Sequence, residues 1–224
     1  MFVVHEPDAA PIDLTGYWVS VVTEDWRYRM VTPAKGDYQA VPMTPDAVKV
    51  ADAWNPEADT AAGNQCKSYG APAIMRVPGR IHITWDGDNT LKLDADAGTQ
   101  SRAFHFQKPS VRGEPSWQGD SVATWETPGG RGRGADAPKT GSLKVVTTNL
   151  KAGYLRKNGV PYSENATVTE YFDIVRERGG DLLLVVTSVV DDSKYLRQPF
   201  IVSTQFKKQP DAKGWDPTPC SSVW

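Results

Sequence analysis

Alternation of apolar and polar residues is clearest between Asn165 and Val190, which read NATVTEYFDIV, RERGGD and LLLVVTSVV. A Gly-Gly pair separates two runs rich in β-formers, a pattern typical of a hairpin. In the first run Val168, Phe172 and Ile174 share one face at period two, and Glu170 falls in the middle of that face. A carboxylate there is costly unless it is paired, hydrogen-bonded or protonated. Glu170 is therefore the first candidate for chemistry.

Further β-type runs are joined mostly by short Gly/Asp/Asn-rich links. A run from Gly16 to Val31 also alternates, and its even positions would place Trp18 and Glu24 on an inward face with Trp26 and Tyr28. Closing such a meander into a barrel removes its exposed edges. We therefore predict a mostly β fold, a single antiparallel up-and-down β-barrel of about nine strands. The other predicted strands are 80–85, 90–95, 99–106, 121–126, 142–149 and 198–208.

Two helix starts interrupt this pattern. Thr44-Pro45-Asp46 and Asn55-Pro56-Glu57 each offer an N-cap residue, a Pro at the first helical position and an acid in the first turn. They predict two short helices that cap one end of the barrel. Residues 1–15 are expected to form an N-terminal arm and residues 16–224 a single domain, in which the Gly/Arg/Pro-rich segment 129–141 is a solvated loop.

Composition narrows the class of protein. The chain has 224 residues, of which 39% are apolar and 23% charged, and its net charge of −2 argues against a nucleic-acid surface. No apolar run is long enough to span a membrane. Eight Trp are many for this length, and they serve either core packing or the lining of a ligand cavity. Motifs for a nucleophile elbow, P-loop, dinucleotide or zinc site are missing from the sequence, so no cofactor and no metal are predicted.

The ends of the chain and its cysteines bear on location. The first residues lack a basic n-region and a long apolar stretch, so we expect the sequence to begin where a signal peptide was removed. Cys66 and Cys220 are far apart, and either a disulfide or two reduced buried thiols would account for them. A disulfide closing that loop would stabilise the fold by about 4–5 kcal/mol in the chain-entropy model.

Two histidines alternate with apolar neighbours on predicted strands. His82 and His105 would face the same side of the wall, with Asp94 as the nearest carboxylate. Two His and one carboxylate suit zinc or iron, but no H-x-H or H-x-x-x-H spacing supports a metal. The remaining interpretations are a histidine general base and histidines without a chemical role.

For Glu170 two interpretations stay open. It forms a buried ion pair that fixes strand register, with Arg102 as first and Arg29 as second candidate cation, or it acts as an acid/base or ligand anchor in an apolar barrel. The loop GYLRKNGVPYSEN (153–165) would bring Tyr154 and Tyr162 to a barrel mouth near it, where a phenol can position or protonate a substrate oxygen.

Two resemblances add to this interpretation. TGYW (15–18) resembles the G-x-W start of lipocalin-like (calycin) barrels. QCKSYGAPAIM, PSWQGDSVATWE, LKVVTTNL, GVPYSENATVTEYF and a late Cys resemble, in this order, a group of secreted bacterial proteins of uncharacterised activity. That resemblance implies a periplasmic or secreted location, supports a Cys66–Cys220 bond, and matches Glu170 to the acid before the strand aromatic. This chain has Tyr162 where the group usually has His, and the resemblance implies no reaction.

Together these observations predict a secreted protein whose barrel encloses a small apolar ligand, aromatic or terpenoid. The first hypothesis is a cofactor-independent lyase, isomerase or hydratase, in which Glu170 is the acid/base, Tyr162 or His105 its partner, and Arg102 holds an oxyanion or the carboxylate. The alternatives are a carrier without turnover and an envelope interaction protein with a filled barrel. The residues expected to complete the ligand site are Trp18, Trp26, Tyr28, Trp125, Tyr154, Glu24 and His82.

Overall fold

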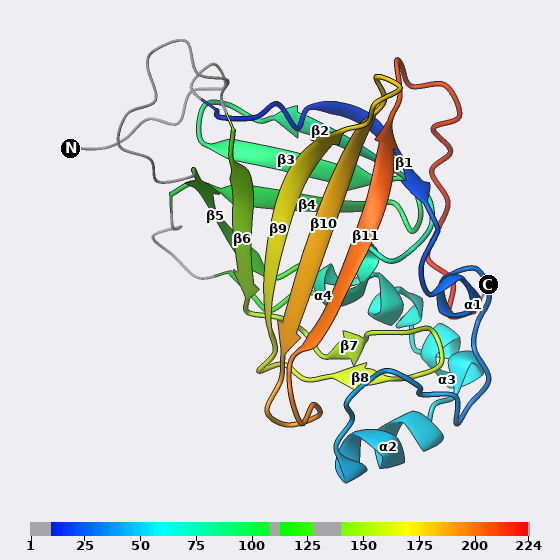
Figure 1. Ribbon diagram of the computed structural model, residues 1–224. Helices are drawn as coiled ribbons and strands as arrows, with labels where there is room; N and C mark the ends of the chain where they lie inside the picture. The colour runs from blue at the N-terminus through cyan, green and yellow to red at the C-terminus, as the bar shows by residue number, and fades with distance from the viewer. Residues whose placement is uncertain (1–9, 108–112, 128–139, 224) are drawn as a thin grey trace.

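A closed β-barrel dominates the computed structural model, which describes residues 10–107, 113–127 and 140–223 (Figure 1). Nine strands follow each other around the wall in the order β1-β11-β10-β9-β6-β5-β4-β3-β2. The strands are β1 (Gly16–Val21), β2 (Arg80–Trp85), β3 (Thr90–Ala95), β4 (Gln100–His105), β5 (Asp120–Glu126), β6 (Ser142–Thr148), β9 (Thr167–Arg176), β10 (Leu182–Asp191) and β11 (Phe200–Lys208). The predicted mostly β barrel of about nine strands is confirmed.

One pair of strands departs from the predicted antiparallel pattern. β4 and β5 run parallel, with Phe104 beside Ser121 and His105 beside Val122. Antiparallel neighbours can be joined by a tight turn, whereas parallel neighbours need a connection that returns along the sheet. The link between His105 and Asp120 is long enough for that return, so the barrel is mixed. The prediction of a wholly antiparallel barrel is wrong at this pair.

The first strand is shorter than the alternation from Gly16 to Val31 predicts. β1 ends at Val21, and Asp25 adopts a left-handed φ of 49° that turns the chain into the helical turn α1 (Trp26–Arg29). The even positions beyond Val21 therefore leave the barrel wall. Trp26 is 65% exposed, so its expected place on the inner face of the barrel is wrong.

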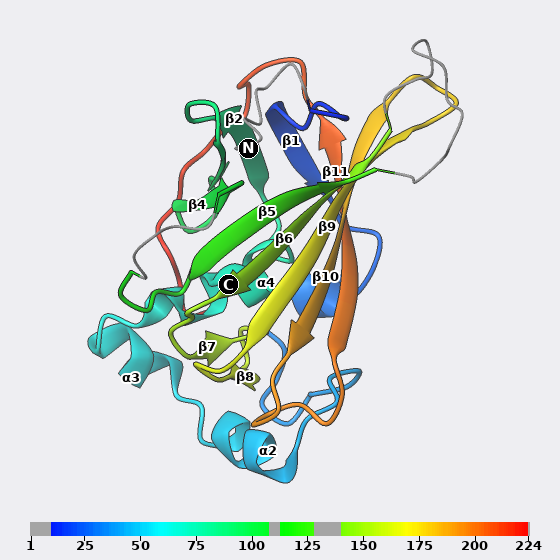
Figure 2. The same cartoon turned by 90° about the vertical axis from the view of Figure 1, so that its left-hand side faces the viewer.

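Helices and a small hairpin cover one end of the barrel (Figures 1 and 2). Both predicted helix starts are confirmed, because the Thr44 and Asn55 side chains accept hydrogen bonds from Ala47 N–H and Ala58 N–H. The covering elements are α2 (Pro45–Asp52), α3 (Pro56–Ala61), the 3₁₀ turn η2 (Gln65–Tyr69), α4 (Ala71–Ile74), β7 (Gly153–Tyr154) and β8 (Pro161–Tyr162). Most of the predicted loop 129–141 lies outside the described residues.

Inside the barrel a layer of polar side chains separates two hydrophobic clusters. Along β9 the inward residues are Val168 in the cluster at the covered end, then Glu170, then Phe172 in the cluster of the barrel body. β10 repeats this order with Val190, Ser188 and Val186. Arg102, Thr147 and Ser121 are buried in the same layer, because hydrogen bonds link them to Glu170 and to one another. Large buried side chains fill the barrel body, among them Trp18, Phe104, Phe172 and Phe206.

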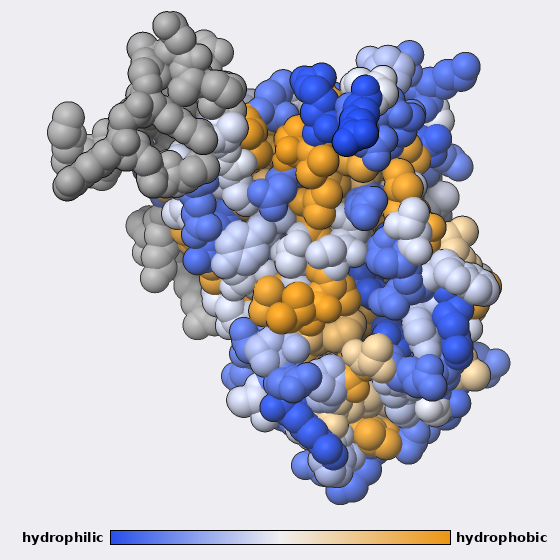
Figure 3. All heavy atoms as spheres, in the orientation of Figure 1, coloured by the Kyte–Doolittle hydropathy of each residue, from blue (hydrophilic) through white to orange (hydrophobic). Residues whose placement is uncertain are grey.

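The outer wall is less polar than strict alternation would make it. β10 carries Leu183, Val185 and Val189 on its outward, half-buried positions, and Ile201 on β11 is 61% exposed. Apolar side chains are accordingly visible across the face over β9, β10 and β11 (Figure 3). The alternation of β10 alone therefore does not tell its inner face from its outer one.

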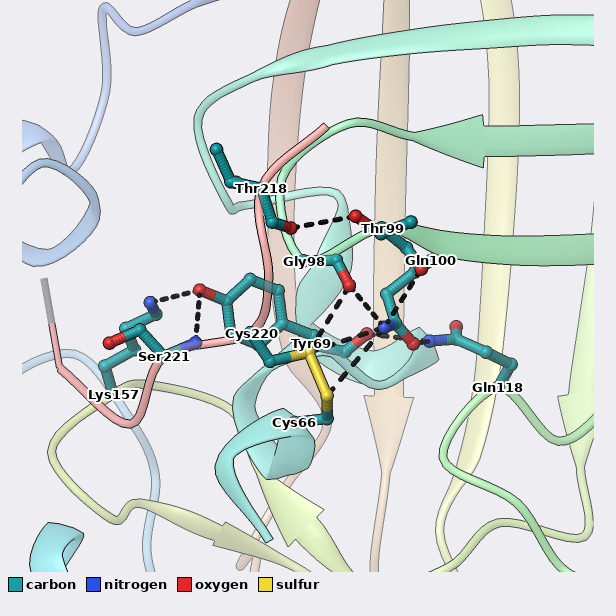
Figure 4. The surroundings of a disulfide bond; sticks show 10 residues. All are labelled: Cys66, Tyr69, Gly98, Thr99, Gln100, Gln118, Lys157, Thr218, Cys220 and Ser221. Carbon is teal, nitrogen blue, oxygen red and sulfur yellow. Dashed lines mark hydrogen bonds between the residues drawn. A yellow bond between two sulfur atoms is a disulfide. The ribbon is translucent and has the colours of Figure 1, made fainter. Parts of the chain in front are cut away.

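The C-terminal segment is tied to the covered end by a Cys66–Cys220 disulfide (Figure 4). Thr218 also pairs with Ala97, and its carbonyl accepts a hydrogen bond from the Thr99 hydroxyl at 2.9 Å. Of the two alternatives for the cysteines, the structure has the disulfide. A search of the described helices for one long and apolar enough to cross a membrane found none.

Replacing both Cys66 and Cys220 by Ser should lower the free energy of unfolding by about 4–5 kcal/mol, because the unfolded chain loses a cross-link between residues 154 positions apart. Urea denaturation with and without a reductant measures this loss. The reductant should destabilise the wild type and leave the double variant unchanged. Equal stability of oxidised and reduced wild type would contradict the expected role of the bond.

Candidate functional site

Glu170 and Arg102 form an ion pair inside the barrel. Both side chains are almost fully buried, and Arg102 Nη1 and Nη2 donate to Glu170 Oε1 and Oε2 at 2.9 and 2.5 Å. Arg102 Nη2 also donates to Thr147 Oγ1 at 3.3 Å, which lies 2.8 Å from Ser121 Oγ, and the guanidinium stands over the Phe104 ring. Two parallel N–H···O bonds are the strongest pairing available to a carboxylate. Glu170 therefore has its counter-charge within the protein.

The other two predicted catalytic residues, His105 and Tyr162, are not part of this ion-pair network. Arg102 and Phe104 point inward from β4, so His105, one position further, points outward and lies 3.1 Å from Thr90 Oγ1 through its Nδ1. Tyr162 is fully buried on β8 in the cluster of the covered end. Its hydroxyl has no hydrogen-bond partner in the described part of the chain, and burial raises its pKa.

Of the aromatic residues expected to line a ligand site, two pack against the barrel core. Trp18 is fully buried and donates its indole N–H to the Leu14 carbonyl at 3.0 Å. Trp125 is half-buried and stacks on Phe106 with ring centroids 5.6 Å apart. For neither Trp18 nor Trp125 does the geometry distinguish ligand binding from core packing.

The remaining expected ligand residues lie outside the barrel interior. Tyr154 on β7 donates to Asp59 Oδ2 at 2.8 Å, and burial together with Asp59 raises its pKa. Glu24 pairs with Arg29 on the segment that follows β1. His82 stacks on Tyr17 on the outer wall and sits opposite Asp94 of β3. Within the described ranges no three His, Cys, Asp or Glu residues are grouped as a metal site.

Three arginines converge on a small cavity at the covered end of the barrel. Arg29 comes from α1, Arg76 from the turn after α4, and Arg156 from the β7–β8 hairpin. The cavity has a volume of about 20 Å³, which is room for one small group. Its lining is completed by Tyr28, Ser68, Ala73, Val77, Leu155 and Lys157. The sequence-based prediction of a polar loop at a barrel mouth included Arg156 but not Arg76.

Two of these arginines have incomplete hydrogen bonds. Arg29 is not one of them, because its three nitrogens donate to Glu24, to Ser20 Oγ at 3.1 Å and to the Arg76 carbonyl at 2.9 Å. Arg76 Nη1 reaches Asp25 Oδ2 at 3.1 Å, but its Nη2 has no partner in the described chain. Arg156 donates through Nη1 to the Gln39 carbonyl at 2.7 Å, and its Nε and Nη2 have none there. Buried N–H groups of this kind are rare in proteins and call for a partner.

Electrostatics indicate the charge of that partner. Arg76 and Arg156 are only 6% and 3% exposed. Burial, together with the positive charge of Arg76, lowers the pKa of Arg156 to about 10. Burial also lowers the pKa of Arg29, which Glu24 opposes and Arg76 reinforces. The cavity thus concentrates positive charge that the surrounding carboxylates only partly offset, and an anion would complete it.

Lys157 points from the same hairpin toward the disulfide (Figure 4). Its Nζ donates to the Tyr69 hydroxyl at 2.6 Å and stands over the Tyr69 ring. The Ser221 N–H, next to Cys220, donates to the same hydroxyl at 3.2 Å. Burial lowers the pKa of Lys157 to about 7. The hairpin therefore links the arginine cavity to the pinned C-terminal segment.

Comparison of the chain with models of protein families, with curated proteins and with solved structures found no match. The catalytic and ligand-binding roles assigned to residues from the sequence therefore stay predictions. The geometry alone decides which of them to pursue.

Glu170→Gln should lower the free energy of unfolding by about 3–5 kcal/mol, because it leaves Arg102 buried without its counter-charge. Urea denaturation measures the loss. The double variant Arg102→Met/Glu170→Leu removes both charges and should recover most of it. A loss below about 1 kcal/mol for Glu170→Gln would show that the pair has the weight of a surface salt bridge only.

Stability should rise with pH above about 7 because of Lys157. Its folded pKa of about 7 lies below the ordinary 10.5, so in this window the unfolded chain binds more protons than the folded one. Unfolding followed between about pH 7 and pH 9 should show the rise, and Lys157→Met should flatten it. The exposed Lys213→Met is the matched control and should keep the wild-type slope. An unchanged slope in Lys157→Met would contradict the assignment.

Proposed function

We propose that this protein binds a small molecule through an anionic group held in the arginine cavity. The observation that carries the proposal is the set of unpartnered, buried N–H groups on Arg76 and Arg156, which line one cavity. Leaving such groups unpaired costs about 1–3 kcal/mol each, more when they are charged. An anion that accepts their hydrogen bonds recovers this free energy on binding.

The shape of the cavity favours a carboxylate. A volume of about 20 Å³ is room for about one water-sized group, so only the oxygen end of an anion enters it, and guanidinium edges match the two oxygens of a carboxylate. Val77, Leu155 and the ring of Tyr28 supply the rest of the wall, so an apolar or aromatic body next to the carboxylate suits the site. This keeps the apolar ligand expected from the sequence and moves it from the barrel interior to the covered end.

Binding without turnover is the form of the proposal that the contacts favour. A lyase, isomerase or hydratase built on Glu170 needs a carboxyl group that can exchange a proton with a substrate. Both oxygens of Glu170 accept bonds from Arg102, while His105 points outward toward Thr90 and Tyr162 belongs to the hydrophobic cluster of the covered end. The predicted acid/base role of Glu170 is therefore not part of the proposed function.

The location of the protein and its relationship to lipocalin-like barrels are also proposals. A disulfide such as Cys66–Cys220 persists in oxidising compartments, which supports a periplasmic or secreted protein. The lipocalin-like relationship is supported by the closed barrel, in which the wall strands follow one another in chain order, and by Trp18 of the G-x-W segment, whose side chain is buried in the barrel.

Acetate should stabilise the wild type in a saturable manner. At a hundred times the Kd the gain is about 2.7 kcal/mol, and each kcal/mol raises the melting temperature of a protein of this size by about 2–4 °C. Thermal unfolding at constant ionic strength, with sodium chloride as the reference salt, measures the effect.

Arg156→Met should remove the saturable part of this gain, because it deletes two of the unpartnered N–H groups. Arg178→Met, on the exposed β9–β10 turn, is the matched control and should respond as the wild type does. Equal stabilisation of all three proteins by acetate would mean that the arginine cavity does not bind this anion.

A further inference from the structure

A second cleft lies on the outer wall, away from the arginine cavity. The sheet β1–β4 forms its floor and the C-terminal segment at Trp215 and Pro217 its rim. Its volume is about 310 Å³, at the lower end of the range for small-molecule sites. The lining residues that matter here are Tyr17, His82, Lys92, Asp94, Ser101 and Trp215.

Three aromatic rings form one side of this cleft. Tyr17 and His82 lie on neighbouring strands and stack face to face, with ring centroids 3.9 Å apart and planes 2° apart. Trp215 crosses the edges of both, at 69° to Tyr17 and 71° to His82. Tyr17 and His82 therefore cover each other, and the three rings leave no parallel pair between which a planar aromatic ligand could insert. The three rings therefore form an aromatic wall, against which one apolar face of a ligand can pack.

The same rings carry polar atoms. Tyr17, His82 and Trp215 are half-buried and line the cleft, so the Tyr17 hydroxyl, the His82 ring nitrogens and the Trp215 indole N–H can form hydrogen bonds with a ligand. Burial lowers the pKa of His82, which Asp94 only partly opposes, so the imidazole is neutral at pH 7 and offers one donor and one acceptor. A ligand that meets this side of the cleft must combine an apolar face with hydroxyl groups at its rim.

The floor of the cleft adds further hydrogen-bonding groups but no net charge. Asp94 Oδ2 is 3.0 Å from Lys92 Nζ, and Asp94 Oδ1 accepts a bond from the Ser101 hydroxyl. The ammonium and the carboxylate neutralise each other, which disfavours a strongly charged ligand. Both side chains keep further hydrogen-bonding capacity toward the cleft.

We infer that this cleft binds a neutral pyranose ring of a saccharide. Such a ring presents an apolar face of C–H groups to an aromatic wall, and its hydroxyl rim matches the donors and acceptors of Asp94, Ser101 and His82. The aromatic wall and the polar floor of the cleft come from different elements, so it is the fold that brings them together. The site is independent of the proposed anion binding, since no arginine of that cavity lines it.

A panel of four probes tests this inference: the methyl pyranosides of glucose, galactose, mannose and N-acetylglucosamine. Saturation-transfer NMR on the full chain detects binding, and tryptophan fluorescence measures its affinity. At least one probe should bind, and Asp94→Asn should weaken it about tenfold by loss of a charge-assisted hydrogen bond. Trp215→Ala should abolish binding, whereas Trp26→Ala, which removes an exposed Trp elsewhere, should leave it unchanged.

Trp215→Ala could also loosen the C-terminal segment, so Asp94→Asn and Ser101→Ala provide a second test at surface positions where unfolding is not expected. Thermal unfolding of each variant checks this. If none of the four pyranosides binds, or if the affinity is the same in Asp94→Asn, Ser101→Ala and Trp215→Ala, the inference is overturned. Binding of indole in place of the pyranosides, sensitive to Trp215→Ala, would assign the cleft to a planar aromatic ligand and equally overturn it.

Discussion

The buried ion pair of Arg102 and Glu170 is the constraint on which the barrel interior depends. Neither charge could stay in an apolar interior alone, so β4 and β9 must both turn these residues to the inside. Because side chains alternate along a strand, this choice fixes the inward face of each strand around them. Both faces of β10 are apolar, so its sequence alone does not show which face is inward. Because Ser188 is paired with Glu170, Ser188 must point inward. The polar layer and the two hydrophobic clusters on either side of it follow from this register.

Two of the arginines at the covered end are less completely bonded. Arg102 has both of its terminal nitrogens engaged by Glu170 and lacks a partner in the described chain only at Nε, whereas Arg76 and Arg156 each keep an Nη2 without a partner there although they are nearly as buried. A guanidinium whose terminal nitrogens are held by a carboxylate contributes to the fold, while one with an unpartnered terminal nitrogen lowers stability until something binds to it. This contrast is why we propose a ligand site at the end of the barrel and a structural role for the pair in its interior.

Local chemistry made much of the fold predictable from the sequence. Period-two patterns located β2 and β3, the side chains of Thr44 and Asn55 marked two helix starts, and Glu170 stood out as a carboxylate that needed a cation. The features that escaped prediction depend on tertiary structure. The segment after Val21 alternates as a strand does, yet the left-handed Asp25 turns it into α1. The arginines of the cavity come from three elements far apart in the chain, so no sequence motif predicts the cavity. These arginines are Arg29, Arg76 and Arg156.

We propose that the arginine cavity holds the carboxylate of a small ligand. A crystal structure of the protein grown or soaked in sodium 4-bromobenzoate, with data collected at the bromine absorption edge, tests this most directly. We expect an anomalous peak at the mouth of the cavity, with the carboxylate oxygens within hydrogen-bond distance of Arg76 Nη2 and Arg156 Nη2. A cavity without such a peak, in which those N–H groups meet only water or side chains of the protein, would contradict it.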